Sequence, residues 1–137
     1  MIKLKTTTRN KALDAITTDA GATAYLWVYT GSPPGKTLGA FNASTGTLLS
    51  KHSMANPIGG AASNGVFTAS AIADATAVGS GTPGYFRINT NSSATDGTTT
   101  IVEGTAGVGS GDLNFAASVT IGAVVSITSL TITEGNA

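Results

Sequence analysis

The chain has 137 residues and a formal net charge of zero, and only 10% of its residues are charged, whereas 41% are hydrophobic. Disorder needs high net charge and few apolar residues, so this composition predicts one folded domain over residues 1–137. Seven basic residues balance seven acidic ones, which argues against nucleic acid as a principal partner. The absence of cysteine excludes disulfides and thiolate metal sites.

Residues 1–22 predict an arm followed by one short helix. Apolar residues and lysines alternate over residues 2–5, a pattern typical of an edge strand or an extended arm. Residues 6–18 carry a narrow apolar face and are followed by Gly21, a typical helix stop. No apolar segment follows the basic start, and no run approaches the roughly 18 apolar residues of a membrane span. We therefore expect neither a signal peptide nor a membrane partner.

The rest of the chain predicts short strands. Residues 23–30 place Tyr25, Trp27 and Tyr29 on one face and apolar residues on the other, which indicates a central strand. Similar runs follow, separated by turns rich in Gly, Asn and Pro: residues 47–53, 65–72, 85–90, 99–104, 112–116 and 124–133. Short strands at this spacing are typical of a sandwich or a barrel.

Irregularities in this pattern mark bends and loops. In the last run, the alternation of apolar and polar residues changes phase near Ser129, which predicts a bulge or a bend. Residues 55–64 and 89–98 are long and polar, and the second segment contains Asn91. Loops of this kind face solvent or dock on a neighbour.

Two glycine motifs resemble nucleotide-binding loops. Residues 31–37, GSPPGKT, have three residues between the glycines where the phosphate-binding motif needs four, and two of the three are prolines without an N–H. Gly79, Gly81 and Gly84 fit G-x-G-x-x-G, but a strand pattern follows where a dinucleotide site needs a helix. Both segments are better interpreted as turns, and we expect no cofactor.

Catalytic and metal-binding patterns are weak. His52 is the single histidine, and we expect it at the surface and not in a metal site. The acidic residues are spread singly along the chain: Asp14, Asp19, Asp74, Asp96, Glu103, Asp112 and Glu134. Acids from separate strands would have to meet in one pocket for catalysis, so an enzyme is an alternative and the expectation is a protein without catalytic residues.

Basic residues gather at the N-terminus. Lys3, Lys5, Arg9 and Lys11 supply four of the seven basic residues before the first acid, Asp14. They form either a basic arm that docks on an acidic partner or a solvated edge strand that lysines protect from aggregation. Most aromatic residues fall in predicted strands and are expected in the core: Tyr25, Trp27, Tyr29, Phe67, Tyr85, Phe86 and Phe115.

Several segments occur together in a characteristic order: TRNKALDAI (8–16), LWVYTGSPP (26–34), TGTLLS (45–50), ASNGVFTASAI (62–72), GYFRI (84–88), GSGDLNF (109–115) and VVSITSLTIT (124–133). In this order the chain resembles small tailed-bacteriophage virion proteins of the capsid decoration or cement type. The resemblance covers nearly the whole chain. It departs at Lys11, where an alanine is more usual, and after Ile16, where the helix end is shorter.

The resemblance implies an all-β fold, a jelly-roll-like antiparallel β-sandwich with one short N-terminal helix. It implies a protein that is made in the cytoplasm of a bacterial host, lies on the capsid surface of the virion, bridges major capsid protein subunits and associates with its own copies as a homo-oligomer. The residues expected to contact partners are Ile2, Lys3, Leu4, Lys5, Arg9, Lys11, Phe41 and Asn91. The alternatives are a tail or baseplate component, or a carbohydrate-binding sandwich with Trp27, Tyr25 or Tyr85 as a stacking platform.

Overall fold

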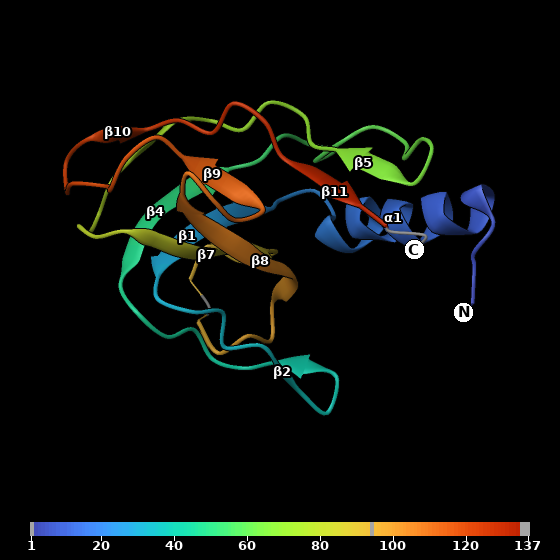
Figure 1. The fold of residues 1–137 in the computed structure, drawn as a ribbon, viewed down its shortest axis with the longest axis horizontal. Helices are drawn as coiled ribbons and strands as arrows, with labels where there is room; N and C mark the ends of the chain where they lie inside the picture. Colours follow the sequence, from blue (N-terminus) through green and yellow to red (C-terminus); the bar gives the residue numbers. More distant parts are fainter. Residues whose placement is uncertain (1, 94, 135–137) are drawn as a thin grey trace.

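A computed structural model describes residues 2–93 and 95–134. Its elements are α1 (Thr6–Ala20), β1 (Tyr25–Thr30), β2 (Lys36–Thr37), β3 (Ala40–Phe41), β4 (Leu48–Ser53), β5 (Val66–Thr68), β6 (Ala75–Thr76), β7 (Pro83–Asn89), β8 (Thr100–Val108), β9 (Leu113–Phe115), β10 (Val124–Val125) and β11 (Thr131–Thr133). Five strands form the main sheet in the order β4-β1-β7-β8-β9, and three two-stranded ribbons pair β2 with β3, β5 with β11 and β6 with β10 (Figure 1). The expected β-rich class with one helix is confirmed.

The main sheet is built around β1. This strand pairs antiparallel with both β4 and β7, as its apolar residues on both faces predict. β9, in contrast, runs parallel to β8, so the sheet is not purely antiparallel as the expected sandwich would be. The chain returns from β8 to β9 in four residues, two of which are glycines with positive φ, Gly109 at 71° and Gly111 at 86°.

Different segments of the chain pack against the two faces of the main sheet. Leu26 and Val28 of β1 face the principal core, where α1 and segments of the ribbons β5–β11 and β6–β10 pack against the sheet. Trp27 and Tyr29 face the other side and belong to a separate aromatic cluster. Residues 31–47, which we call the cover loop, lie on that side and include the ribbon β2–β3 (Figure 1).

Helix α1 is attached to the body by both apolar and polar contacts. Leu13 is buried in the principal core. The side chains of Asn10 and Asp14 accept backbone N–H groups of the turn at residues 62–65, at 2.8 and 2.6 Å. The helix ends at Gly21 with a φ of 62°, as expected, and is two residues longer than predicted. No helix within the described ranges is long and apolar enough to cross a membrane.

Two strand predictions are wrong in extent. Of the two alternatives for residues 2–5, an edge strand or an extended arm, the structure shows no strand, and the segment leads directly into α1. The run 65–72 keeps only the three residues of β5, and the run 124–133 divides into β10 and β11. Ile127 and Leu130, three residues apart, are both buried, which breaks the alternation of a strand between them. The interrupted segment contains Ser129, the position at which the change of phase in the sequence predicts a bulge or a bend.

Candidate interaction site

A row of side chains crosses the covered face of the main sheet, one from each of four strands. The strand register places Lys51 of β4 opposite Trp27 of β1, Trp27 opposite Arg87 of β7, and Arg87 opposite Glu103 of β8. The ammonium group of Lys51 lies 4.3 Å from the centre of the Trp27 ring, within the range of a cation–π contact. The row therefore places cationic, aromatic and anionic side chains next to one another across the sheet.

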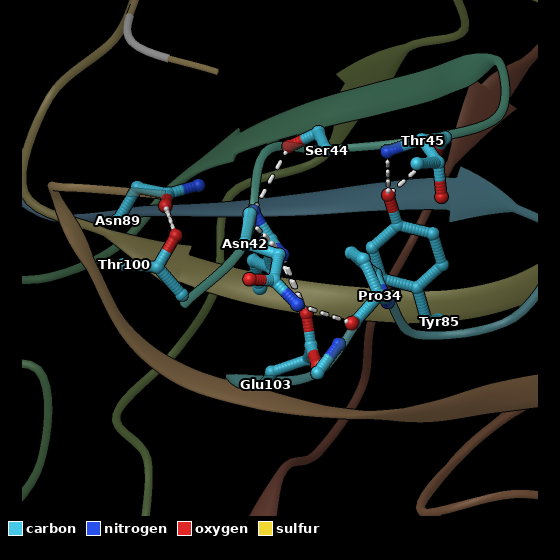
Figure 2. A network of polar contacts seen from close by, with 10 residues as sticks. Pro34, Asn42, Ser44, Thr45, Tyr85, Asn89, Thr100 and Glu103 are labelled. Atoms are coloured by element: carbon cyan, nitrogen blue, oxygen red, sulfur yellow. Dashed lines mark hydrogen bonds and ion pairs between the residues drawn. The ribbon is translucent and has the colours of Figure 1, made fainter. Parts of the chain in front are cut away.

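An aromatic pair lies beside this row. The rings of Tyr29 and Tyr85 stack with their centres 4.8 Å apart, and burial raises the pKa of Tyr29. The hydroxyl of Tyr85 donates to the carbonyl of Thr45 at 2.6 Å and accepts its N–H at 3.0 Å (Figure 2). Trp27 and Tyr85 are completely buried, so neither ring can stack on a sugar. The prediction that either residue forms a sugar-binding platform is therefore wrong. The aromatic residues of these strands are core residues, as predicted.

Arg87 and Glu103 form a buried ion pair. Nη2 of Arg87 lies 2.7 Å from Oε2 of Glu103, and Nε donates to the same oxygen at 2.8 Å. The two side chains are only 1% and 6% exposed. Buried charges are tolerated only when they are paired and their remaining donors and acceptors are bonded, so the groups around this pair matter as much as the pair itself.

The remaining atoms of the ion pair bind the cover loop. Arg87 donates through Nη2 to the carbonyl of Asn42 at 2.7 Å and through Nη1 to the hydroxyl of Ser44 at 3.1 Å. Oε1 of Glu103 accepts the N–H of Gly35 at 2.9 Å. Figure 2 shows Asn42, Ser44 and Glu103 gathered where the loop crosses the sheet. The buried charges therefore hold the cover loop onto the sheet.

Contacts of the glycines explain the two glycine motifs. In the segment GSPPGKT, the N–H of Gly35 is bonded to Glu103, a carboxylate of the same chain. A Cβ at Gly84 would collide with the backbone of Gly31, and one at Gly79 would collide with the carbonyl of Leu48. These glycines permit close approach of backbone segments, which supports their interpretation as turn and packing residues.

The cover loop carries a hairpin, residues 36–41, which we call the Leu38 hairpin. β2 and β3 pair through a two-residue turn in which Leu38 and Gly39 have φ values of 52° and 87°. Positive φ at both positions is the pattern of a type I′ turn. Leu38 is fully exposed, at 103% of its reference area. The ammonium group of Lys36 lies 4.4 Å from the centre of the Phe41 ring on the neighbouring strand.

The base of the Leu38 hairpin is closed by Asn42. Its N–H donates to the carbonyl of Gly35, and its side-chain amide donates to the carbonyl of Pro34, both at 2.9 Å. The carbonyl of Asn42 also accepts from the buried Arg87. The hairpin thus projects from a base that is bonded to the sheet.

The predicted partner contacts in the arm are exposed, with one exception. Ile2 is 91% exposed, Leu4 is partly exposed, and Lys3, Lys5 and Lys11 are exposed. Arg9 is half-buried, and its Nη1 donates to the carbonyl of Glu134 at 3.1 Å. Arg9 therefore fastens α1 to the segment that follows β11. Met1 lies outside the described residues.

The other two predicted contacts, Phe41 and Asn91, come from loops that lie together. Phe41 is half-buried in β3, and Asn91 is exposed. The N–H of Ser44 donates to the carbonyl of Thr95 at 2.7 Å, and Gly97 packs against the backbone of Phe41. The structure therefore brings these two loops to one side of the sheet, while the arm extends from the N-terminal end of α1 (Figure 1).

The prediction of a surface position for His52 is wrong. Regular antiparallel pairing of β1 with β4 places Ser50 and His52 opposite Val28 and Leu26, on the face toward the principal core, and the register shifts only beyond Val28. His52 is completely buried, with Nδ1 2.9 Å from the carbonyl of Ala73 and Nε2 2.9 Å from the hydroxyl of Ser50. A carbonyl only accepts, so Nδ1 carries the proton and Nε2 accepts from Ser50. Burial lowers the pKa of His52.

A second group of exposed aliphatic side chains lies on the ribbon β6–β10. Val124 pairs with Thr76 across the ribbon, and Val78 and Ile121 lie two and three residues away from this pair along the chain. All three aliphatic residues are exposed by more than half of their surface. The ribbon lies on the opposite side of the main sheet from the Leu38 hairpin (Figure 1).

A groove of about 510 Å³ lies between β9 and residues 126–131. Its carboxylate is Asp112, whose Oδ2 accepts the N–H and hydroxyl of Thr105 at 2.9 and 2.7 Å, and these bonds hold its pKa below the ordinary range. Within residues 2–93 and 95–134, no three His, Cys, Asp or Glu side chains gather closely enough to hold a metal ion.

Sequence reasoning missed Arg87, Glu103 and Leu38. Each charged residue of the pair is isolated in a run that is otherwise suited to a strand, GYFRI and TIVEG, and that isolation was the available signal. Comparison of the chain with protein-family models, curated proteins and solved structures gives no match.

Proposed function

We propose that this chain is a structural protein of a tailed-bacteriophage virion, a capsid decoration or cement protein that bridges major capsid protein subunits on the outer shell. The order of its sequence segments supports this proposal through the resemblance described above. The observation that carries it is the position of the aliphatic side chains that are exposed by more than half of their surface. They lie on three separate parts of the molecule: Ile2 in the arm, Leu38 in the hairpin, and Val124 with its neighbours on the ribbon β6–β10 (Figure 1).

A bridging protein needs contact points on more than one side. Contacts of modest area at separate points reinforce one another when one copy spans two subunits, because the second contact forms within the same complex. The low charge of the chain favours this use, since few ions lose water when its surface is covered. The buried ion pair adds a rigid support for one of these points.

The proposal includes the finer features that the resemblance implies. The main sheet and the three ribbons are taken as a jelly-roll-like sandwich, and copies of the chain associate with one another on the shell. No catalytic step and no cofactor is part of this function. The exposed lysines of the arm, Lys3 and Lys5, add attraction to acidic surface on a capsid subunit.

The copy number in purified particles tests this function against its nearest alternative. Quantitative mass spectrometry of intact virions would give the ratio of this chain to the major capsid protein. A fixed ratio set by the symmetry of the shell supports decoration. A few copies per particle would move the protein to the tail or baseplate, and its absence from particles would overturn a virion role.

A further inference from the structure

We infer that the Leu38 hairpin is the anchor of this protein on its partner. Leu38 inserts into an apolar socket of a protein surface, and Lys36 pairs with a carboxylate at the rim of that socket. The inference rests on the proposed function and names the contact through which that function is carried out.

The backbone of Leu38 is the first reason. Side chains other than Gly, Asn and Asp are rare at positive φ because their Cβ crowds the backbone, and type I′ turns strongly prefer Asn-Gly. Here the turn is Leu-Gly, with Leu38 at a φ of 52°. Its side chain is fully exposed, so burial against the described chain does not compensate the strain. A partner that covers the side chain would.

The support beneath the hairpin is the second reason. Asn42 closes its base and receives a hydrogen bond from Arg87, which is itself bonded to Glu103. Ser44 adds a further bond to Arg87. A side chain presented from a rigid base loses little conformational entropy when it binds, so more of the free energy of its burial is retained as affinity.

The charge and shape of the hairpin define the partner. Residues 36–41 contain one cation, Lys36, and no acid. A projecting turn with an apolar tip fits a concave apolar site, and the cation beside it fits a carboxylate rim. One aliphatic side chain with one lysine would give only marginal binding to a bilayer, where stable anchoring takes more than one signal. The features therefore favour a protein socket over a lipid surface.

The test is the substitution Leu38→Asn, compared with Leu38→Met. Asn-Gly suits the type I′ turn better, so Leu38→Asn should raise the Tm by about 2–6 °C. The same variant should bind empty capsids of the particle roughly 10- to 100-fold more weakly, because the buried aliphatic side chain is lost. Leu38→Met keeps an apolar side chain and should bind within about threefold of the unmodified protein.

Val124→Asn is the comparison variant, since it removes an exposed aliphatic side chain from a second proposed contact point, on the other side of the sheet. Its binding should fall less than that of Leu38→Asn. Equal loss of capsid binding in both variants would overturn the inference that Leu38 is the anchor. Unchanged capsid binding of Leu38→Asn would overturn it as well. Neither result would contradict the proposed function. If the unmodified protein binds no capsids, the proposed function falls together with the inference. Loss of binding to anionic phospholipid vesicles on Leu38→Asn, with capsid binding unchanged, would favour a membrane and overturn the socket.

Discussion

Arg87 and Glu103 lie directly opposite each other on β7 and β8, and their charged groups meet 2.7 Å apart beneath the cover loop. Every further bond of the pair reaches that loop, at Gly35, Asn42 and Ser44. The pair therefore links two parts of the fold that sequence patterns treat separately: a buried strand pair and a polar loop.

Replacing Glu103 with Gln leaves the guanidinium of Arg87 buried without a counter-charge. We expect a loss of about 3 kcal/mol in the free energy of unfolding, measured by urea denaturation, because a broken buried pair leaves an uncompensated charge. Hydrogen exchange should accelerate in the cover loop more than in β1. Asp19→Asn, an exposed acid on α1, should change stability by less than about 0.5 kcal/mol. Unaltered loop exchange in Glu103→Gln would contradict the link between the pair and the loop.

The burial of His52 makes stability depend on pH. Its pKa is lowered in the folded protein from an ordinary value of 6.5, chiefly by burial, which outweighs the opposing effects of its bond to Ala73 and of nearby Asp74. The unfolded chain therefore takes up the proton first, and the free energy of unfolding should fall as the pH drops below about 6.5.

Urea denaturation between pH 7.5 and 5 measures this effect. In His52→Gln the slope over that interval should largely disappear, although the variant is less stable at every pH. Asp96 and Asp112 have pKa values below the ordinary 3.8, so their titration lies outside the interval. An equal slope in both proteins would show that another group causes the dependence.

The environment of Trp27 predicts its fluorescence. The indole is completely buried on the face of the main sheet where the cover loop lies, so its emission should lie to the blue of exposed tryptophan and resist quenching by acrylamide. Sugars should leave the spectrum unchanged. Glu103→Gln, which loosens the loop, should increase quenching. A red, readily quenched emission from the unmodified protein would place Trp27 at the surface and revive a binding platform.

Gly84 tests the packing interpretation of the glycine motif. A Cβ at this position would collide with the backbone of Gly31, so Gly84→Ala should lower the free energy of unfolding by about 3 kcal/mol. Gly60 has open space around its Cβ position and no positive φ, and Gly60→Ala should be close to neutral. Thermal denaturation of both variants measures the difference. Comparable Tm values would mean that the chain at Gly31 moves aside easily.

Local patterns predicted the parts of the fold that depend on local sequence. The run from Tyr25 to Thr30 is apolar on both faces and does become an interior strand of the main sheet, and Gly21 does end the helix. The jelly-roll connectivity stays a prediction. The parallel pairing of β9 was not predictable, because it depends on how a short glycine loop after β8 returns to the sheet.

The candidate site was harder to predict because it depends on register. The position of His52 follows from the register of β4 on β1, which pairs it with the buried Leu26 and cannot be read from the run 47–53 alone. Arg87 and Glu103 are 16 residues apart and meet only through the pairing of β7 with β8. Leu38 lies in a polar stretch where nothing marks a two-residue turn except the glycine that follows it. The partner contacts predicted for the N-terminal residues, for Phe41 and for Asn91 stay predictions.

Binding of the purified protein to empty capsids decides whether it is a decoration protein. Bound copies would be counted by cosedimentation over a range of protein and salt concentrations. We expect saturation at a number set by the symmetry of the shell, with weaker binding at high salt if Lys3, Lys5, Lys11 and Lys36 contribute. Absence of binding to intact shells, under conditions where the protein is folded, would contradict a role on the capsid surface.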